Sequence, residues 1–146
     1  MTSYEKRTWW SRHGMTERLA GDNFLEASIT SAFLIAAADG QASEAEYDAL
    51  LDRLEILGGV DRDKIDELLT AAATNLEANG FEPQIARVAE LVSDKEAASA
   101  VLMLSLAVAL ADDDVSMQER EIANQIATGL GLDAVDLEAL LTEIRE

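Results

Sequence analysis

The chain repeats one pattern twice, and this repeat limits the folds that it can adopt. The stretch AADGQASEAEYDALLDRLEILGG begins at residue 37, and LADDDVSMQEREIANQIATGLGL begins at residue 110. Each contains an Asp after an apolar run, a Ser with a Glu three residues later, and an amphipathic run that ends at Gly. The segments DRDKIDELLT (61–70) and DAVDLEALLT (133–142) extend the match. One buried helix, an acidic turn and two further helices therefore occur twice, which predicts a pseudo-symmetric bundle.

Apolar residues recur with the helical period along most of the chain. The helix expected over about 23–38 and the one from SDKE (93–96) to about Ala111 are apolar on all sides, which is typical of helices buried in a bundle. The SDKE motif predicts a capping box, and Asp61 is expected to N-cap another helix. The remaining helices are expected at about 44–57, from Asp61 to Gly80, after Pro83, at 117–130 and at 134–145. We therefore predict an all-α, single-domain bundle of about seven helices, with an internal two-fold repeat and two buried central helices.

Composition and charge exclude several classes of function. The net charge of −18 argues against a nucleic-acid-binding protein, which needs a basic surface. It favours cations or a basic protein partner, although a charged surface that keeps the protein soluble is the simpler explanation of the charge as a whole. The chain has no Cys, so it can form neither a disulfide nor a thiolate site. Its longest apolar stretches are shorter than the roughly 20 residues that a spanning helix requires, and its beginning does not resemble a signal peptide. We expect a cytoplasmic protein.

The first 21 residues differ from the rest and are expected to form a separate segment, followed by the helical domain at 22–146. Residues 1–20 hold four basic and two acidic side chains, and they include Trp9 and Trp10. The segment either packs on the acidic body through charge and aromatic burial or contacts a membrane through the tryptophans. We favour packing on the body, because two adjacent Trp residues cannot share one face of a helix.

The glutamates of the two acidic turns have a structural explanation. Ser43 with Glu46, and Ser116 with Glu119, each match the S-x-x-E capping box, which satisfies the unpaired N–H groups at a helix start. Under this interpretation the turns need no metal ion.

The aspartates are harder to explain by capping. Asp39 and Asp112 follow the C-terminal turns of apolar helices, where a negative charge costs roughly 0.3–1 kcal/mol. Carboxylates beside free helix carbonyls form an all-oxygen environment of the kind that Ca²⁺ and Mg²⁺ prefer. Asp39 and Asp112 are therefore candidate metal ligands, and Glu46 and Glu119 could each add an oxygen. The spacing is not that of an EF-hand, and both interpretations of the turns stay open.

The same stretches resemble the TerB family of tellurite-resistance proteins. The resemblance is carried by AADGQASEAE, by ELVSDKEAASAVLMLSLAVA and by LAVALADDDVSMQEREIANQIATGLGLD, and it covers about residues 22–142. It implies an all-helical bundle with an acidic cluster that binds calcium or a similar divalent ion. It also implies a role in tellurite resistance and stress responses, with links to membrane-associated complexes. The positions that match the cluster are Asp39, Glu46, Asp112 and Glu119, and Asp113 stands where the family has Gly.

Three functions are compatible with the sequence. The first is a non-enzymatic scaffold or adaptor that binds a divalent cation, calcium rather than magnesium, and an unidentified protein partner, in the cytoplasm or at a membrane through that partner. The second is an interaction domain without metal, and the third is a hydrolase that uses carboxylates and a metal. Catalysis is not expected, because the chain has a single His, His13, and no nucleophile motif. Direct reduction of tellurite is not expected either, because it would require thiols.

Overall fold

The structure is a computed structural model that describes residues 11, 14–38, 44–92, 94–109, 116–132 and 135–145. Its helices are α2 (Met15–Leu19), α3 (Asp22–Ala36), α4 (Glu44–Gly58), α5 (Arg62–Asn79), α6 (Phe81–Leu91), α7 (Lys95–Ala109), α8 (Met117–Gly129) and α9 (Val135–Arg145). The described residues contain no strand. The all-α prediction is therefore confirmed, and seven of these helices lie in the region where about seven were expected.

Helices α3 and α7 form the centre of the bundle. Every residue from Ala27 to Ala36 in α3 is buried, as is every residue from Ala100 to Val108 in α7. The two helices pack on each other more extensively than any other pair. Their interface includes the buried Ser105 hydroxyl, which lies 2.7 Å from the Val101 carbonyl of its own helix and 3.1 Å from the Ser28 carbonyl of α3. The prediction of two buried central helices is correct.

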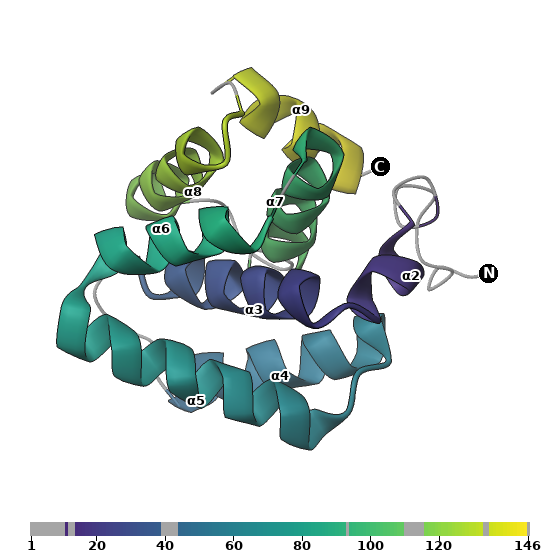
Figure 1. The fold of residues 1–146 in the computed structure, drawn as a ribbon, viewed down its shortest axis with the longest axis vertical. Helices are drawn as coiled ribbons and strands as arrows, with labels where there is room; N and C mark the ends of the chain where they lie inside the picture. Colours follow the sequence, from purple (N-terminus) through teal and green to yellow (C-terminus); the bar gives the residue numbers. More distant parts are fainter. Residues whose placement is uncertain are drawn as a thin grey trace.

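The other helices cover this central pair. Figure 1 shows α4 and α5 below α3, with α6, α7, α8 and α9 above it. Helix α6 links the two halves of the bundle, because it packs on α3, α5 and α8. Its buried Gln84 donates a hydrogen bond of 2.7 Å to the Ala72 carbonyl of α5. Its contact with α8 is close, since a Cβ added at Gly129 would lie 3.0 Å from Ile85 Cγ2.

The two halves of the bundle use equivalent contacts. Helix α3 packs on α4 and α5, α4 packs on α5, and the same three pairings recur among α7, α8 and α9. Helices α4 and α8 are each followed by a glycine with positive φ, Gly59 at 64° and Gly131 at 83°, a conformation that glycine adopts without strain. The predicted repeat implies the same helix pairings in both halves, and the two-fold symmetry itself stays a prediction.

The N-terminal segment contributes to the core through α2. Met15 and Leu19 are buried, and α2 packs on α3 and α4. Trp9, Trp10 and His13 lie outside the described residues, so the position of the tryptophans stays a prediction.

Two helix starts differ in detail from the sequence-based expectation. Asp61 stands at the N-cap of α5, but its carboxylate accepts no hydrogen bond from that helix. At the start of α7, Asp94 Oδ1 accepts a 2.8 Å bond from Ala97 N. Asp94 therefore caps a helix that begins at Lys95, one residue later than the SDKE capping box requires. Ser93 itself lies outside the described residues. Aspartate and serine cap helices about equally well, so the motif alone does not decide between them.

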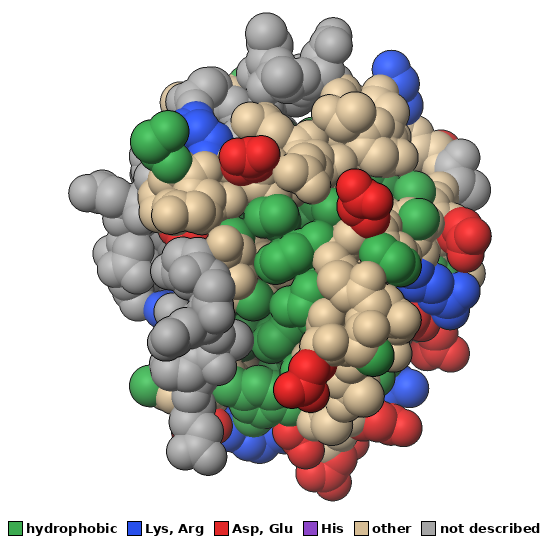
Figure 2. All heavy atoms as spheres, turned by 90° about the vertical axis from the view of Figure 1, so that its left-hand side faces the viewer, with side chains coloured by type: hydrophobic (Ala, Val, Ile, Leu, Met, Phe, Trp, Pro, Cys, Tyr) green, Lys and Arg blue, Asp and Glu red, His purple; other side chains and the backbone are tan. Residues whose placement is uncertain are grey.

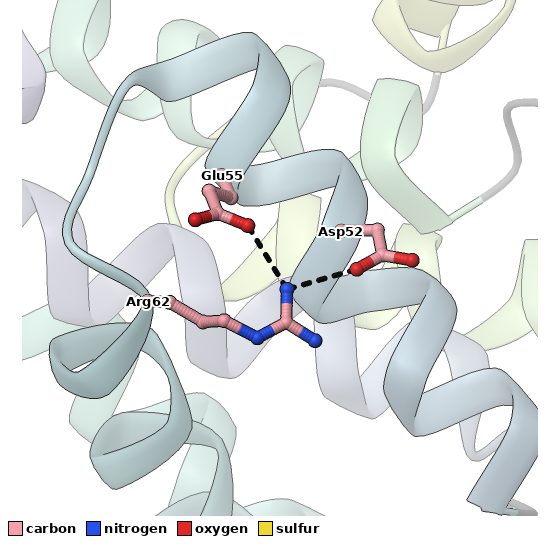
Figure 3. A network of polar contacts seen from close by, with 3 residues as sticks. All are labelled: Asp52, Glu55 and Arg62. Carbon is pink, nitrogen blue, oxygen red and sulfur yellow. Dashed lines mark hydrogen bonds and ion pairs between the residues drawn. The ribbon is translucent and has the colours of Figure 1, made fainter.

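Polar side chains join α4 to α5 on the outside of the bundle. Arg62 Nη1 lies 2.9 Å from both Asp52 Oδ1 and Glu55 Oε1 (Figure 3). Tyr47 donates to Asp66 Oδ1 at 2.9 Å, and its oxygen lies 2.8 Å from Thr70 Oγ1. The contacts of Arg62 are exposed to water, so they direct the turn between the helices more than they stabilise it.

Truncation of a central side chain should destabilise the whole bundle. Leu102 in α7 is 0% exposed, and we expect Leu102→Ala to lower the free energy of unfolding by about 2–5 kcal/mol, because it leaves a cavity. Ile56 in α4 is 77% exposed, and Ile56→Ala should change stability by less than about 0.5 kcal/mol. Urea unfolding followed by circular dichroism measures both. Equal losses in the two variants would contradict the central position of α7.

The Tyr47 contacts predict a loss of stability at alkaline pH. Burial raises the pKa of Tyr47, and its hydrogen bond to Asp66 and the charges of Asp66 and Asp48 raise it further, against a lowering by Thr70. The pKa of Tyr47 is therefore higher in the folded chain than in the unfolded chain, where it is about 10. The contribution of Tyr47 to stability is fully present below this unfolded-state pKa and is lost as the pH rises through the folded-state pKa.

Tyr47→Phe should therefore remove part of the alkaline loss of stability. At neutral pH it should cost about 0.5–1 kcal/mol, because it removes exposed hydrogen bonds. Unfolding free energies at a series of pH values from neutral to alkaline measure both effects. A wild-type profile that runs parallel to the Tyr47→Phe profile above pH 10 would refute the prediction.

Candidate cation-binding turns

The described residues include only part of the predicted metal site. Asp39 and Asp112 lie outside them, and so does the side chain of Glu46, which belongs to the first turn of α4. Glu119 is described fully, in the first turn of α8. Within the described part of the chain, no three His, Cys, Asp or Glu residues are grouped so that they could hold a metal ion. Assembly of the four candidates into one site stays a prediction.

The start of α8 is a complete capping box. Ser116 Oγ accepts a bond of 3.1 Å from Glu119 N, and Glu119 Oε1 accepts one of 2.9 Å from Ser116 N. Ser116 has the extended backbone expected of an N-cap, with φ −72° and ψ 164°. The capping interpretation is therefore correct for this turn. One carboxylate oxygen of Glu119 is therefore engaged in capping.

One of the carbonyl groups at the end of α7 already accepts a hydrogen bond from a side chain. Val108 is among the last four residues of the helix, whose carbonyls have no partner inside the helix. Its oxygen accepts a 2.8 Å hydrogen bond from Arg53 Nη1, a partly buried contact that arrives from α4. Helix α7 has no basic residue in its own last turn. The positive charge that a helix C-terminus favours therefore comes from another helix.

Sequence reasoning missed Arg53. One feature of the sequence could have drawn attention to it. Arg53 is the single basic residue between Glu44 and Gly58, a stretch that holds five acidic residues (Glu44, Glu46, Asp48, Asp52 and Glu55). Nothing in the sequence says that α4 crosses the end of α7, so the partner of Arg53 follows only from the packing.

The helices that flank the two acidic turns are interleaved. Helix α4 follows the first turn and packs on α7, which precedes the second, while α8 follows the second turn and packs on α3. Arg53 lies in the second half of α4, about 13 Å along the helix axis from Glu44. The end of α7 therefore meets α4 beyond its first turn. The helices that flank the two turns therefore contact each other, and a single site shared by the two turns stays a prediction.

Two further surface features lie away from the turns. A cleft of about 280 Å³ between α3, α5 and α6 is lined by Leu68, Ala72, Asn75 and Asn79, beside an ion pair of 3.3 Å between Arg87 and Glu26. It is smaller than a typical ligand pocket. Figure 2 shows a band of hydrophobic side chains, with acidic residues at its edges, on the side of the molecule that carries the turn from α5 to α6.

No described helix has the length and apolar character needed to cross a membrane. Even α7, whose residues from Ala100 to Val108 are all buried, is 15 residues long and is covered by protein.

Loss of the α8 cap should destabilise the protein by a predictable amount. Ser116→Ala removes the acceptor for Glu119 N, and we expect it to lower the free energy of unfolding by about 1 kcal/mol. Thr128→Ala, at an exposed position near the other end of α8, should change stability by less than about 0.5 kcal/mol. Urea unfolding in the presence of a chelator measures both variants. A neutral effect of Ser116→Ala would show that the cap adds nothing.

Comparison with known proteins identifies the family. No curated protein and no solved structure matches the chain. The family described as "Tellurite resistance protein TerB" matches over residues 25–142, which include all helices from α4 to α8 and most of α3 and α9. This match extends over most of the chain and confirms the resemblance that the repeated acidic turns indicated. The chain therefore belongs to the TerB family.

Proposed function

We propose that this TerB-family chain is a non-enzymatic, cytoplasmic scaffold or adaptor that binds a divalent cation at its paired acidic turns. The bound ion would neutralise the turns and hold their helices in one arrangement, which would present a surface to a protein partner. The family description supports a tellurite-resistance or stress-response setting.

The observation that supports this proposal most strongly is the charge balance around the second turn. Residues 110–115 connect the end of α7 to the capping box of α8 and include three consecutive aspartates, Asp112 to Asp114. The negative end of the α7 dipole adds to these charges. Among the described contacts at this end, Arg53 supplies one positive charge. The sequence of this connection is strongly acidic, and a divalent cation would neutralise part of its charge.

Calcium is the ion that the residues favour. It accepts six to eight oxygen ligands in flexible geometry, whereas magnesium demands a near-ideal octahedron and keeps several of its waters. Asp39, Asp112, Glu46 and Glu119 would be the protein ligands. Since Glu119 Oε1 and the Val108 carbonyl are engaged in other bonds, carboxylate oxygens and water would supply most of the coordination.

A second candidate is an interaction domain that binds no metal. The capping box of Ser116 and Glu119 supports it, because capping accounts for one acidic side chain of the turn without an ion. Catalysis is not part of either proposal. The chain has no Cys and a single His, which leaves no thiol for tellurium chemistry and no pair of histidines for acid–base catalysis.

Calorimetric titration of the full, chelator-stripped chain with CaCl₂, and then with MgCl₂, distinguishes the two candidates. Asp39→Asn and Asp112→Asn remove one charge from each turn without changing the size of the side chain. We expect saturable calcium binding in the micromolar range that both variants weaken at least tenfold, and weaker magnesium binding. The number of ions bound distinguishes a single shared site from one site at each turn.

Asp63→Asn is the matched control, because Asp63 is an exposed aspartate in the first turn of α5, away from both turns. It should leave calcium affinity within about twofold of wild type, since exposed charges are screened by salt. If wild type binds no calcium, or if Asp63→Asn weakens binding as much as Asp112→Asn, the metal-free interaction domain is the correct function.

A further inference from the structure

We propose that the cleft between α3, α5 and α6 is a binding site for a small zwitterion of the class of the free α-amino acids. Figure 1 shows α5 and α6 on opposite sides of α3, joined by a short turn. The cleft has a volume of about 280 Å³ and is lined by residues of these three helices. At roughly 30 Å³ for each water molecule, it holds about nine waters or one molecule of that size. The acidic turns do not contribute to it, so this inference does not depend on the proposed function.

Two buried polar side chains of the cleft have an oxygen without a hydrogen-bond partner. Thr30 of α3 and Gln84 of α6 line the cleft, and each is 5% exposed. Gln84 Nε2 donates to the Ala72 carbonyl at 2.7 Å, which orients the amide and leaves Oε1 without a partner among the described residues. Thr30 Oγ1 has no partner among them either. Ser28 Oγ and Ser31 Oγ are sealed in the core, whereas the oxygens of Thr30 and Gln84 stay open to a ligand that donates hydrogen bonds.

The charged side chains of the cleft form a pair of opposite sign. Among the described residues that line it, Glu26 and Arg87 alone are charged, and Glu26 Oε2 lies 3.3 Å from Arg87 Nε. Arg87 Nη1 also lies 3.8 Å from Glu90 Oε1 of the same helix. These contacts are open to water and therefore weak, and they use two of the five N–H groups of the guanidinium. Both charges of the pair are thus available to a ligand.

A zwitterion fits this pair better than an ion of one sign. Arg87 would repel a cation in the cleft, and Glu26 would repel an anion. An α-amino acid carries its ammonium and its carboxylate on one carbon atom, so its two charges lie close together, as those of Glu26 and Arg87 do. The ammonium has three N–H donors, which match the Glu26 carboxylate, the Thr30 hydroxyl and Gln84 Oε1. The carboxylate would accept charge-assisted hydrogen bonds from Arg87.

The remaining side chains of the cleft indicate which amino acids it would accept. Leu68, Ala71 and Pro83 are apolar, and Asn75 and Asn79 present neutral amides one helical turn apart on α5. The described lining offers no further charge to a charged ligand side chain. The bound amino acid should therefore have a small, uncharged side chain.

NMR titration of the full, ¹⁵N-labelled chain in the presence of a chelator tests the site. The probes are glycine, L-alanine, L-serine and L-asparagine, and the amide signals of Thr30, Asn75 and Gln84 report binding. We expect at least one probe to shift these signals saturably, with a Kd on the order of 1 mM or tighter. Propionate and n-propylammonium each lack one charge, and 4-aminobutyrate holds its two charges further apart. All three should bind at least about tenfold more weakly, because each loses charge-assisted hydrogen bonds.

Variants connect the binding to individual side chains. Glu26→Gln and Arg87→Gln should each weaken the tightest probe at least about tenfold, and Thr30→Val, which keeps the shape of the side chain, about two- to tenfold. Arg62→Gln is the matched control, because Arg62 also pairs with two exposed carboxylates but lies outside the cleft. It should keep the affinity within about twofold of wild type. Melting temperatures measured without probe verify that each variant is folded.

Two results would overturn the inference. One is that no probe binds saturably at the cleft, or that propionate or n-propylammonium binds as tightly as the best amino acid. The other is that Arg62→Gln weakens binding as much as Arg87→Gln does. Because the probes are titrated in chelator, neither result bears on calcium binding, and a failure of calcium binding leaves this site unaffected.

Discussion

The contact between α3 and α7 is the constraint on which the rest of the structure depends. Both helices are buried over most of their length on all sides, so neither could lie on the surface of a soluble domain. Small residues at the contact, Ser28 and Ser105, allow a side-chain hydroxyl of one helix to reach the backbone of the other. The two helices cannot shield all of each other's apolar surface from water, so six further described helices pack around them. The requirement to bury this surface determines the architecture.

Burial of the central pair also determines where the acidic residues lie. A helix that is apolar throughout must end where the chain leaves the core, and in both halves the acidic turn follows at that point. The helix end carries unpaired carbonyls, and at α7 one of them is satisfied by Arg53 from α4. At α8 the N–H groups are satisfied within the turn, by Ser116 and Glu119. The end of α7 is thus contacted by a positively charged side chain, and the start of α8 is closed by a capping box.

The capping box at the start of α8 does not conflict with the cation binding that we propose at the second turn. Glu119 uses Oε1 for the cap and keeps a second oxygen, while the aspartates have no capping function that the sequence requires. Arg53 donates a hydrogen bond to the Val108 carbonyl, so one positively charged side chain lies at the end of α7.

The sequence by itself determined the helical class, the positions of the helices to within a few residues, the burial of α3 and α7, and the capping box at Ser116. These features depend on periodicity and on interactions between residues three or four positions apart, which can be read along the chain. Only the tertiary structure decided that Asp94 caps α7, that Tyr47 contacts Asp66, and that Arg53 reaches Val108. The first depends on a choice between adjacent residues that cap equally well, and the other two on how separate helices cross. A crossing depends on the packing of whole helix surfaces, so the contact of Arg53 with the end of α7 was not predictable from the sequence around Arg53.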